Sequence, residues 1–383
     1  MRTVFINGRV LTDAGLEDGL AVAVEGERIA AVAPRREVPL RGAEVVDLDG
    51  NLLLPGFIDI QVNGGGGVLF NDEPTVEAIE AIGRVHRRFG TTGFLPTLVS
   101  DDLGVVAQAI AATRDAIARG VPGVLGLHIE GPFLNEKRRG VHDASKIREL
   151  DDEAFELLTT PTGGKTLITL APEKTTPAMI RALTRAGVIV SAGHSDATYA
   201  QVREALAAGL SGFTHLFNAM SQLTVREPGV VGAALEDEES WCSIIVDGHH
   251  VDPVVLRLAL RTKRRDRFIL VTDAMPSVGS TMTSFRLLGK RVEVRDGTCI
   301  DDQGTLAGSN LDMASSVRNT IDLLGVEAAE AVGMASRHPA AFLGLPHTGR
   351  IAPGRSAALS IATPGMTIVD TWIDGRISSA AGR

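Results

Sequence analysis

Short apolar runs recur along the middle of the chain, and each ends in polar residues before an amphipathic stretch begins. Eight of them lie between residues 56 and 275: GFIDIQVNG (56–64), TGFLPTLVS (92–100), VLGLHIEG (124–131), LITLAPE (167–173), VIVSAGHSD (188–196), GFTHLFN (212–218), CSIIVDGHH (242–250) and FILVTDAM (268–275). Helical periodicity follows several of them, at residues 73–90, 101–120, 176–187 and 197–209. Strands that are apolar throughout are typical of a parallel sheet buried on both faces. Eight strand–helix units predict an α/β fold, and favour a (β/α)8 TIM-like barrel over a doubly wound open sheet.

The two ends of the chain differ from the middle. β-Branched residues and turns that contain glycine predict short strands within residues 4–55, and the same pattern resumes at 357–364 and 367–377. We expect one small β-sandwich domain formed by the N- and C-terminal segments. The predicted division is 1–53 for the N-terminal part of the sandwich, 54–348 for the barrel and 349–383 for the C-terminal part.

Three further segments complete the prediction, two after the eighth strand and one between the sixth and seventh. Residues 284–303 alternate around a DG turn and predict an inserted hairpin, and residues 311–342 predict helices. The segment 226–237 has weak periodicity, so we expect a long loop over the barrel mouth.

Composition narrows the classes of partner. The chain has 383 residues and a formal net charge of -9, which disfavours nucleic acid as a partner. No run of about 18 apolar residues predicts a membrane span, and the first residues lack the features of a signal peptide. Two cysteines, Cys242 and Cys299, cannot build a disulfide framework, so we expect a cytoplasmic protein.

Polar residues gather where the predicted strands end, and that is where barrels of this type carry catalytic groups. The set is Gln61, Asn63, Glu130, Glu173, His194, His215, Asp247, His249, His250 and Asp273, and His142 lies in the loop after the third strand. One carboxylate and two imidazoles from three strands, Glu130, His194 and His215, suit a metal site with an open position for water. Taken singly, each histidine fits a turn or core residue equally well.

A metal-activated water needs a proton acceptor, and Asp273 lies at the end of the eighth strand. The alternative for Asp273 is a cap of the following segment. Asp247 receives no catalytic role, because the sequence VDGHH also fits a simple turn.

Several motifs occur in a recognisable order: PGFID, HIEGPF, SAGHS, THLFNAM, DGHHV, VTDAM, LAGS and SRHPAA. Over essentially the whole chain, this order resembles that of the N-acetylglucosamine-6-phosphate deacetylases, a branch of the metal-dependent amidohydrolases. The resemblance implies a barrel with a β-sandwich made from both ends, in agreement with the pattern of apolar residues. It also implies a cytoplasmic homodimer that acts on a small phosphosugar.

The resemblance assigns roles to individual residues. It implies one divalent metal ion per subunit, zinc before iron, manganese or cobalt, held by Glu130, His194 and His215. Asp273 is then the general base and acid, and His142 polarises the acetamide carbonyl. Sugar and phosphate are held by groups that match Asn218, the backbone of Ala219, Arg226 and His250, with His250 donated across the dimer interface.

Gln61 and Asn63 stand where many amidohydrolases carry a His-x-His pair for a second metal. Their i, i+2 spacing places both side chains on one face of the strand. Amides are weak metal ligands but good hydrogen-bonding groups, so we interpret them as lining the pocket of a one-metal enzyme.

The predicted reaction is hydrolysis of the acetamide of N-acetylglucosamine 6-phosphate to glucosamine 6-phosphate and acetate. The alternatives are deacetylation of the galacto epimer and another amidohydrolase reaction, such as that of a cyclic amidase. Cyclic amidases usually carry His-x-His and a carbamylated lysine, and neither occurs at the predicted strand ends. A non-catalytic barrel is expected to lose its ligands or its base. Lys137, Arg138 and Arg139 fit either a loop that closes on the phosphosugar or a solvated surface, and the solvated interpretation is favoured. His249 is given no role.

Overall fold

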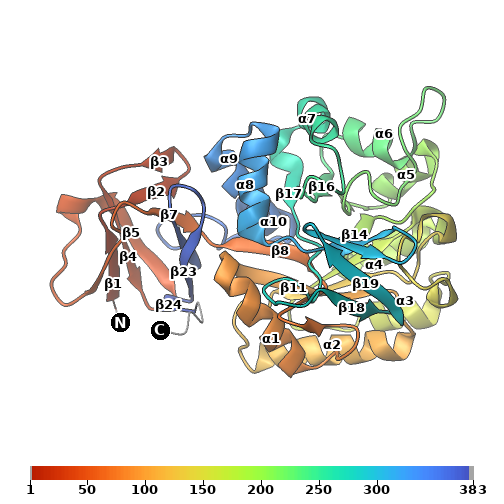
Figure 1. Ribbon diagram of the computed structural model, residues 1–383, viewed down its shortest axis with the longest axis horizontal. Helices are drawn as coiled ribbons and strands as arrows, with labels where there is room; N and C mark the ends of the chain where they lie inside the picture. Colours follow the sequence, from red (N-terminus) through yellow and green to blue (C-terminus); the bar gives the residue numbers. More distant parts are fainter. Residues whose placement is uncertain (1, 379–383) are drawn as a thin grey trace.

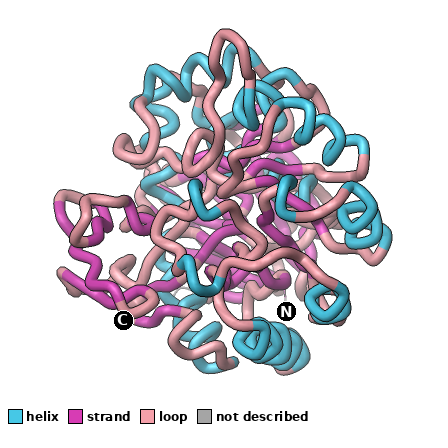
Figure 2. The backbone as a smooth tube through the Cα atoms, turned by 90° about the vertical axis from the view of Figure 1, so that its right-hand side faces the viewer, coloured by secondary structure: helices cyan, strands magenta, loops and turns pink. Residues whose placement is uncertain are grey.

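A parallel barrel forms the centre of the computed structural model, which describes residues 2–378. Its eight-stranded sheet has the order β17-β16-β15-β14-β13-β12-β11-β8, and Figure 2 shows the strands at the centre with helices around them. The strands are β8 (Phe57–Val62), β11 (Thr91–Val99), β12 (Gly126–Glu130), β13 (Lys165–Leu170), β14 (Ile189–Ala192), β15 (Gly212–Phe213), β16 (Trp241–Ile244) and β17 (Phe268–Leu270). Each of the eight predicted strands is present, which confirms the barrel.

The barrel closes between β8 and β17 without a regular strand ladder. One parallel bridge joins Val62 to Ala274, just beyond the end of β17. The amide of Asp273 donates to the carbonyl of Gln61 at 3.0 Å, and that of Asn63 donates to the carbonyl of Ala274 at 3.0 Å. The first and last strands therefore meet through the residues expected in the site.

Helices alternate with the strands and cover the outside of the barrel (Figure 1). Local signals start them: Thr176 caps α4 and Pro177 stands at its first position, while Thr198 and Gln201 form a capping box on α5. The helices are α1 (Val76–His86), α2 (Leu103–Ala118), α3 (Asp152–Leu158), α4 (Pro177–Arg185), α5 (Tyr199–Ala207), α6 (Gly229–Glu236), α7 (Pro253–Thr262), α8 (Met313–Leu324), α9 (Ala328–Ala335) and α10 (Arg337–Phe342).

Both ends of the chain build the β-sandwich at the left of Figure 1. One sheet holds β5 (Arg28–Pro34), β4 (Leu20–Glu25), β1 (Arg2–Ile6) and β6 (Glu44–Asp47); the other holds β24 (Arg376–Ile377), β23 (Ile368–Ile373), β22 (Leu359–Ala362), β7 (Leu52–Pro55), β2 (Arg9–Thr12) and β3 (Gly15–Glu17). Phe5 and Val22 from the first sheet share a buried cluster with Leu53, Leu359 and Trp372 from the second. The predicted sandwich is thus confirmed, whereas the boundaries 1–53, 54–348 and 349–383 stay a prediction.

The predicted insertion after the eighth strand differs in detail from the structure, and one hairpin was not predicted. The insertion after β17 is a four-stranded antiparallel sheet rather than a single hairpin, with strands β18 (Ser284–Leu287), β19 (Lys290–Arg295), β20 (Thr298–Asp301) and β21 (Leu306–Ser309). A small hairpin, β9 (Gly64–Gly65) and β10 (Val68–Leu69), follows β8.

The prediction of a loop across 226–237 was wrong, because residues Gly229–Glu236 form α6. Six of its eight residues are buried, so the helix has no polar face to create a periodic pattern. Within residues 2–378, no helix is both long enough and apolar enough to cross a membrane.

Candidate active site

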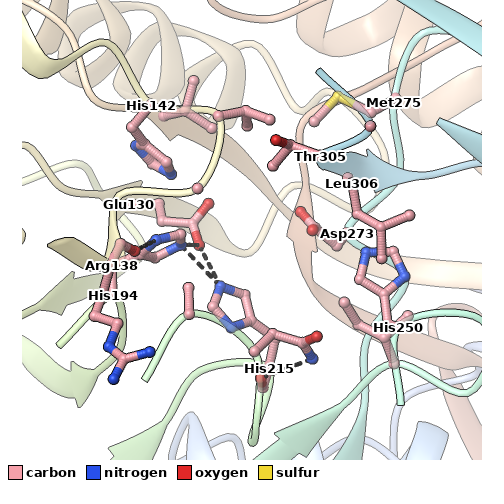
Figure 3. A pocket seen from close by; sticks show the side chains of 18 of the residues that line it. Glu130, Arg138, His142, His194, His215, His250, Asp273, Met275, Thr305 and Leu306 are labelled. Atoms are coloured by element: carbon pink, nitrogen blue, oxygen red, sulfur yellow. Dashed lines mark hydrogen bonds and ion pairs between the residues drawn. The ribbon is translucent and has the colours of Figure 1, made fainter. Parts of the chain in front are cut away.

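A pocket of about 460 Å³ opens at the carboxyl ends of the barrel strands. This volume lies in the range of pockets that hold small-molecule ligands. Glu130, His142, His194, His215, His250 and Asp273 all line it. Figure 3 shows Glu130 with His194 and His215 on one side and Asp273 facing them, with His250 beside it. The structure therefore brings together residues that are up to 143 positions apart in the sequence, from Glu130 to Asp273.

Glu130, His194 and His215 converge on one point. Oε1 of Glu130 lies 3.2 Å from Nε2 of His194 and 2.9 Å from Nε2 of His215, and the two Nε2 atoms are 3.0 Å apart. All three residues are buried, and their ligand atoms lie within 4.8 Å of one another. One carboxylate with two imidazoles is a donor set typical of a catalytic metal site.

The charge balance of this trio favours a cation. Burial raises the pKa of Glu130, but the hydrogen bonds and charges of His194 and His215 outweigh it and hold that pKa well below its usual range. For His215, burial lowers the pKa, and the bond to Glu130 more than reverses this, so the pKa is raised. The trio thus stabilises positive charge at its centre, and the residues fit a divalent metal ion.

Neighbouring groups orient the two histidines. Nδ1 of His194 lies 2.9 Å from the carbonyl oxygen of Arg138, so it carries the proton and leaves Nε2 free to bind a metal. The backbone amide of His215 donates to the hydroxyl of Ser243 at 2.7 Å. Both histidines have a left-handed backbone, with φ of 49° and 36°. Such angles are uncommon outside glycine and are found at functional sites, where they turn the side chain out of the strand direction.

Asp273 is held by the two amides of strand β8. Its Oδ1 accepts from Nε2 of Gln61 at 3.1 Å and from Nδ2 of Asn63 at 2.6 Å. Gln61 Nε2 also donates to Oε1 of Glu130 at 3.1 Å, so one amide joins both carboxylates. Burial, together with the charge of Glu130, raises the pKa of Asp273 to about 6. Gln61 and Asn63 therefore act as hydrogen-bond donors to the pocket's carboxylates.

His142 lies above His194, with their ring centroids 4.4 Å apart. Its Nδ1 accepts from the backbone amide of Ser100 at 3.3 Å and lies 2.7 Å from the Ser100 hydroxyl. This arrangement puts the ring proton on Nε2. Burial and the charge of His194 lower the pKa of His142 to about 3, so the ring is neutral at pH 7.

The residues expected to hold the sugar phosphate divide into two groups. Asn218, Ala219 and His250 line the pocket, whereas Arg226 is exposed and lies outside the set of residues that line it. His250 lies in the pocket of its own chain.

Two functional residues were missed by sequence reasoning. Asp247 accepts from Nδ1 of His250 at 2.6 Å and from its backbone amide at 2.9 Å, so it orients that ring. In the sequence, an aspartate three positions before a histidine was the signal for this contact. Arg138 and Lys137 both line the pocket: the Arg138 side chain pairs with Asp196 at 2.9 Å and is 37% exposed, and the Lys137 side chain is 80% exposed, so their interpretation as solvated stays a prediction. Ser100, which holds His142, carries no signal in the sequence.

Comparison with known proteins identifies the family of this chain. Residues 52–378 match the amidohydrolase family, and the chain belongs to that family.

Its relatives are more specific. An N-acetylgalactosamine-6-phosphate deacetylase from Shewanella sp. (strain ANA-3) is 45% identical over 86% of this chain and 84% of its own length. An N-acetylglucosamine-6-phosphate deacetylase from Haemophilus influenzae is 36% identical over 98% and 99%. The crystal structure of N-acetylglucosamine-6-phosphate deacetylase from Pasteurella multocida superposes with a TM-score of 0.95, at 37% identity over 98% and 99% of the two chains.

Removing the carboxylate of Glu130 is expected to abolish tight metal binding. Glu130→Gln loses an anionic ligand, and we expect divalent metal to bind at least about 100-fold more weakly, since even residues that only support a ligand are worth about 10–100-fold. Metal analysis after dialysis and titration calorimetry measure the change. Asp273→Asn is the matched control, because it also neutralises a pocket carboxylate but should keep its metal. Equal metal loss in both variants would contradict the assignment.

Proposed function

We propose that this chain hydrolyses the acetamide of N-acetylglucosamine 6-phosphate, which yields glucosamine 6-phosphate and acetate. The observation that carries the proposal is the meeting of Glu130, His194 and His215 at one point, with Asp273 across the pocket. The relatives named for this activity support the choice of substrate. A divalent metal held by Glu130, His194 and His215 would supply Lewis acidity, which lowers the pKa of a water toward 7.

Asp273 moves the proton. Its carboxylate is ionised at neutral pH and accepts a proton from the attacking water. Because its pKa is raised to about 6, the acid form is also a competent donor, and it returns the proton to the nitrogen that departs as the amine. Water supplies the oxygen of acetate, and the C–N bond is the bond that breaks.

His142 stabilises the developing negative charge on the carbonyl oxygen. The Ser100 amide occupies Nδ1, so Nε2–H is the donor that the ring offers to the pocket. A neutral imidazole makes this contact without taking the proton that Asp273 handles. Donors of this kind are worth about 3–4 kcal/mol of transition-state stabilisation.

Asn218, the backbone of Ala219 and His250 hold the sugar phosphate, with Asp247 keeping the proton on Nδ1 of His250. We infer one metal ion per subunit, zinc before iron, manganese or cobalt, since a Glu/His2 set accepts each of them. Cytoplasmic location is supported by two buried cysteines that are both free.

A homodimer completes the proposal. Donation of His250 across the interface stays a prediction, but the place of His250 in its own pocket favours Arg226 as the crossing residue. Exposed apolar side chains precede Arg226 in the sequence: Val225 is fully exposed and Leu223 is 57% exposed. Leu258 on α7 is 55% exposed. Leu223 and Leu258 line a common groove. A second copy that covers this groove can bring its Arg226 to the phosphate, for which guanidinium is well suited.

Deacetylation of the galacto epimer is the second candidate. The Shewanella relative named for N-acetylgalactosamine 6-phosphate is 45% identical to this chain, which favours this reading. The cyclic amidase alternative is disfavoured, because Gln61 and Asn63 bind the pocket's carboxylates as amide donors.

Acetate release tests the proposal. The metal-loaded enzyme should release acetate from N-acetylglucosamine 6-phosphate and much less from the unphosphorylated sugar, and the galacto epimer decides between the two candidates. Asp273→Asn should keep its metal but lower kcat by about 10²–10⁴-fold, the typical worth of a general base. Near wild-type turnover in that variant would exclude Asp273 as the base, and no acetate from either phosphosugar would exclude deacetylation.

The rate should fall in acid. Asp273 accepts a proton only when ionised, so kcat/KM should decrease as the pH drops through a midpoint at or below about 6. A cation at the trio moves that midpoint down, because positive charge lowers the pKa of a neighbouring carboxyl. A pH–rate profile measures this, and a kcat/KM that rises as the pH falls from about 7 to 5 would contradict the role.

Mixed subunits test the crossing of Arg226. Arg226→Ala should raise KM by about 10–100-fold through the loss of charged hydrogen bonds to phosphate. When the Arg226→Ala and Asp273→Asn proteins are unfolded and refolded together, half of the dimers contain one subunit of each. One of the two sites in such a dimer then has both Asp273 and an Arg226 from the partner subunit. Activity should then recover to about a quarter of wild type, as expected for a two-fold symmetric dimer. No recovery would show that Arg226 serves its own subunit.

A further inference from the structure

Asp59 is a buried carboxylate on β8 that the proposed chemistry does not use. It has no exposed surface, and within residues 2–378 it forms no ion pair with a basic side chain. Three donors satisfy it instead. The hydroxyl of Thr272 donates to its Oδ2 at 2.5 Å, and the amides of Thr272 and Gln61 donate to its Oδ1 at 3.3 and 3.2 Å. Because a buried carboxylate is costly unless it is hydrogen-bonded, this group is coupled to the residue before Asp273.

The hydrogen bonds between Asp59 and Thr272 lie where the barrel closes. β8 and β17 are the two ends of the eight-stranded sheet, and one bridge, Val62 with Ala274, closes them. The carboxylate of Asp59 joins the strands just inside that bridge. It therefore adds a side-chain link to the backbone hydrogen bonds at the seam that carries Gln61 and Asn63 on one side and Asp273 on the other.

The backbone of Asp273 needs such support. Its φ is 51°, in the left-handed region, which persists only when the surroundings impose it. Ser309 holds the same dipeptide from the other side: its hydroxyl donates to the carbonyl of Thr272 at 2.5 Å, and its amide donates to the carbonyl of Asp273 at 2.9 Å. Asp59 and Ser309 thus clamp Thr272 and Asp273 between them.

We propose that Asp59 is a positioning residue for Asp273, acting through Thr272 to fix the backbone that presents the Asp273 carboxylate to the substrate. The inference rests on the proposed function, because it assumes that Asp273 transfers the proton. It explains why an acidic side chain is kept inside the barrel, in contact with Gln61 and Thr272 rather than with the pocket.

The chain offers a matched pair of variants. Thr272→Val removes the hydroxyl that Asp59 binds and keeps the shape of the side chain. Thr97→Val removes a buried hydroxyl that also contacts β8, accepting from the amide of Val62 at 2.9 Å, but from the side of β11. Both variants lose buried hydrogen bonds: the Thr272 hydroxyl also accepts from the amide of Ala274 at 3.2 Å, and the Thr97 hydroxyl also donates to the carbonyl of Leu95 at 3.2 Å. Only the Thr272 hydroxyl contacts Asp59. Thr272→Ser keeps the hydroxyl and serves as the conservative rescue.

The measurements are kcat, KM, metal content and the midpoint of thermal unfolding. For Thr272→Val we expect kcat to fall by about 10- to 100-fold, as misplacement by a fraction of an ångström to 1 Å does, with KM within about threefold and metal content unchanged. Thr272→Ser and Thr97→Val should keep kcat within about threefold, even where Thr97→Val unfolds at a lower temperature.

Two results would overturn the inference: equal loss of kcat in Thr272→Val and Thr97→Val, or a rise in KM with kcat unchanged. If Thr272→Val does not fold, Ser309→Ala reaches the same clamp from the other side and must show the same fall in kcat alone. A wild-type enzyme that releases no acetate defeats the proposed function, whereas an active wild type with an unaffected Thr272→Val defeats only the role of Asp59.

Discussion

The buried carboxylate of Glu130 is the group on which the arrangement of the pocket depends. Glu130 is 2% exposed, and an ionised carboxylate at that depth must be paired and hydrogen-bonded. His194, His215 and Gln61 meet this requirement, and they come from the ends of three other strands. Each of these strands must therefore end at the correct height in the barrel, so the register of the sheet and the charge balance of the site constrain each other.

Backbone geometry at the strand ends makes this convergence possible. Glu130 and Gln61 reach the pocket from the ends of regular strands, whereas His194, His215 and Asp273 lie just beyond the ends of theirs. His194, His215 and Asp273 all have positive φ, and all three face the pocket. Hydrogen bonds surround these residues: the amide of Ser309 donates to the carbonyl of Asp273, Asp59 accepts from Thr272, and the amide of His215 donates to Ser243. Such conformations are held by their surroundings and are found at functional sites.

Much of this was predictable because alternation and strand ends carry information in the sequence. Apolar runs gave all eight strands, and the polar residue after each run gave Glu130, His194, His215 and Asp273. The failures have physical causes. Helix α6 is buried on nearly all sides, so it shows no amphipathic period. Ser100 and the carbonyl of Arg138 act through contacts that only the folded loops create.

The two amides of β8 also set the chemistry of the base. Gln61 and Asn63 donate to Asp273 without bringing charge, so they lower its pKa less than a cationic neighbour does, and burial still keeps that pKa raised to about 6. A lysine, or a second cation held by histidines at these positions, would pair with the carboxylate and lower its pKa further. Asp273 would then be a weaker proton acceptor near neutral pH. Neutral donors on β8 thus bind the carboxylate of Asp273 firmly while preserving its basicity.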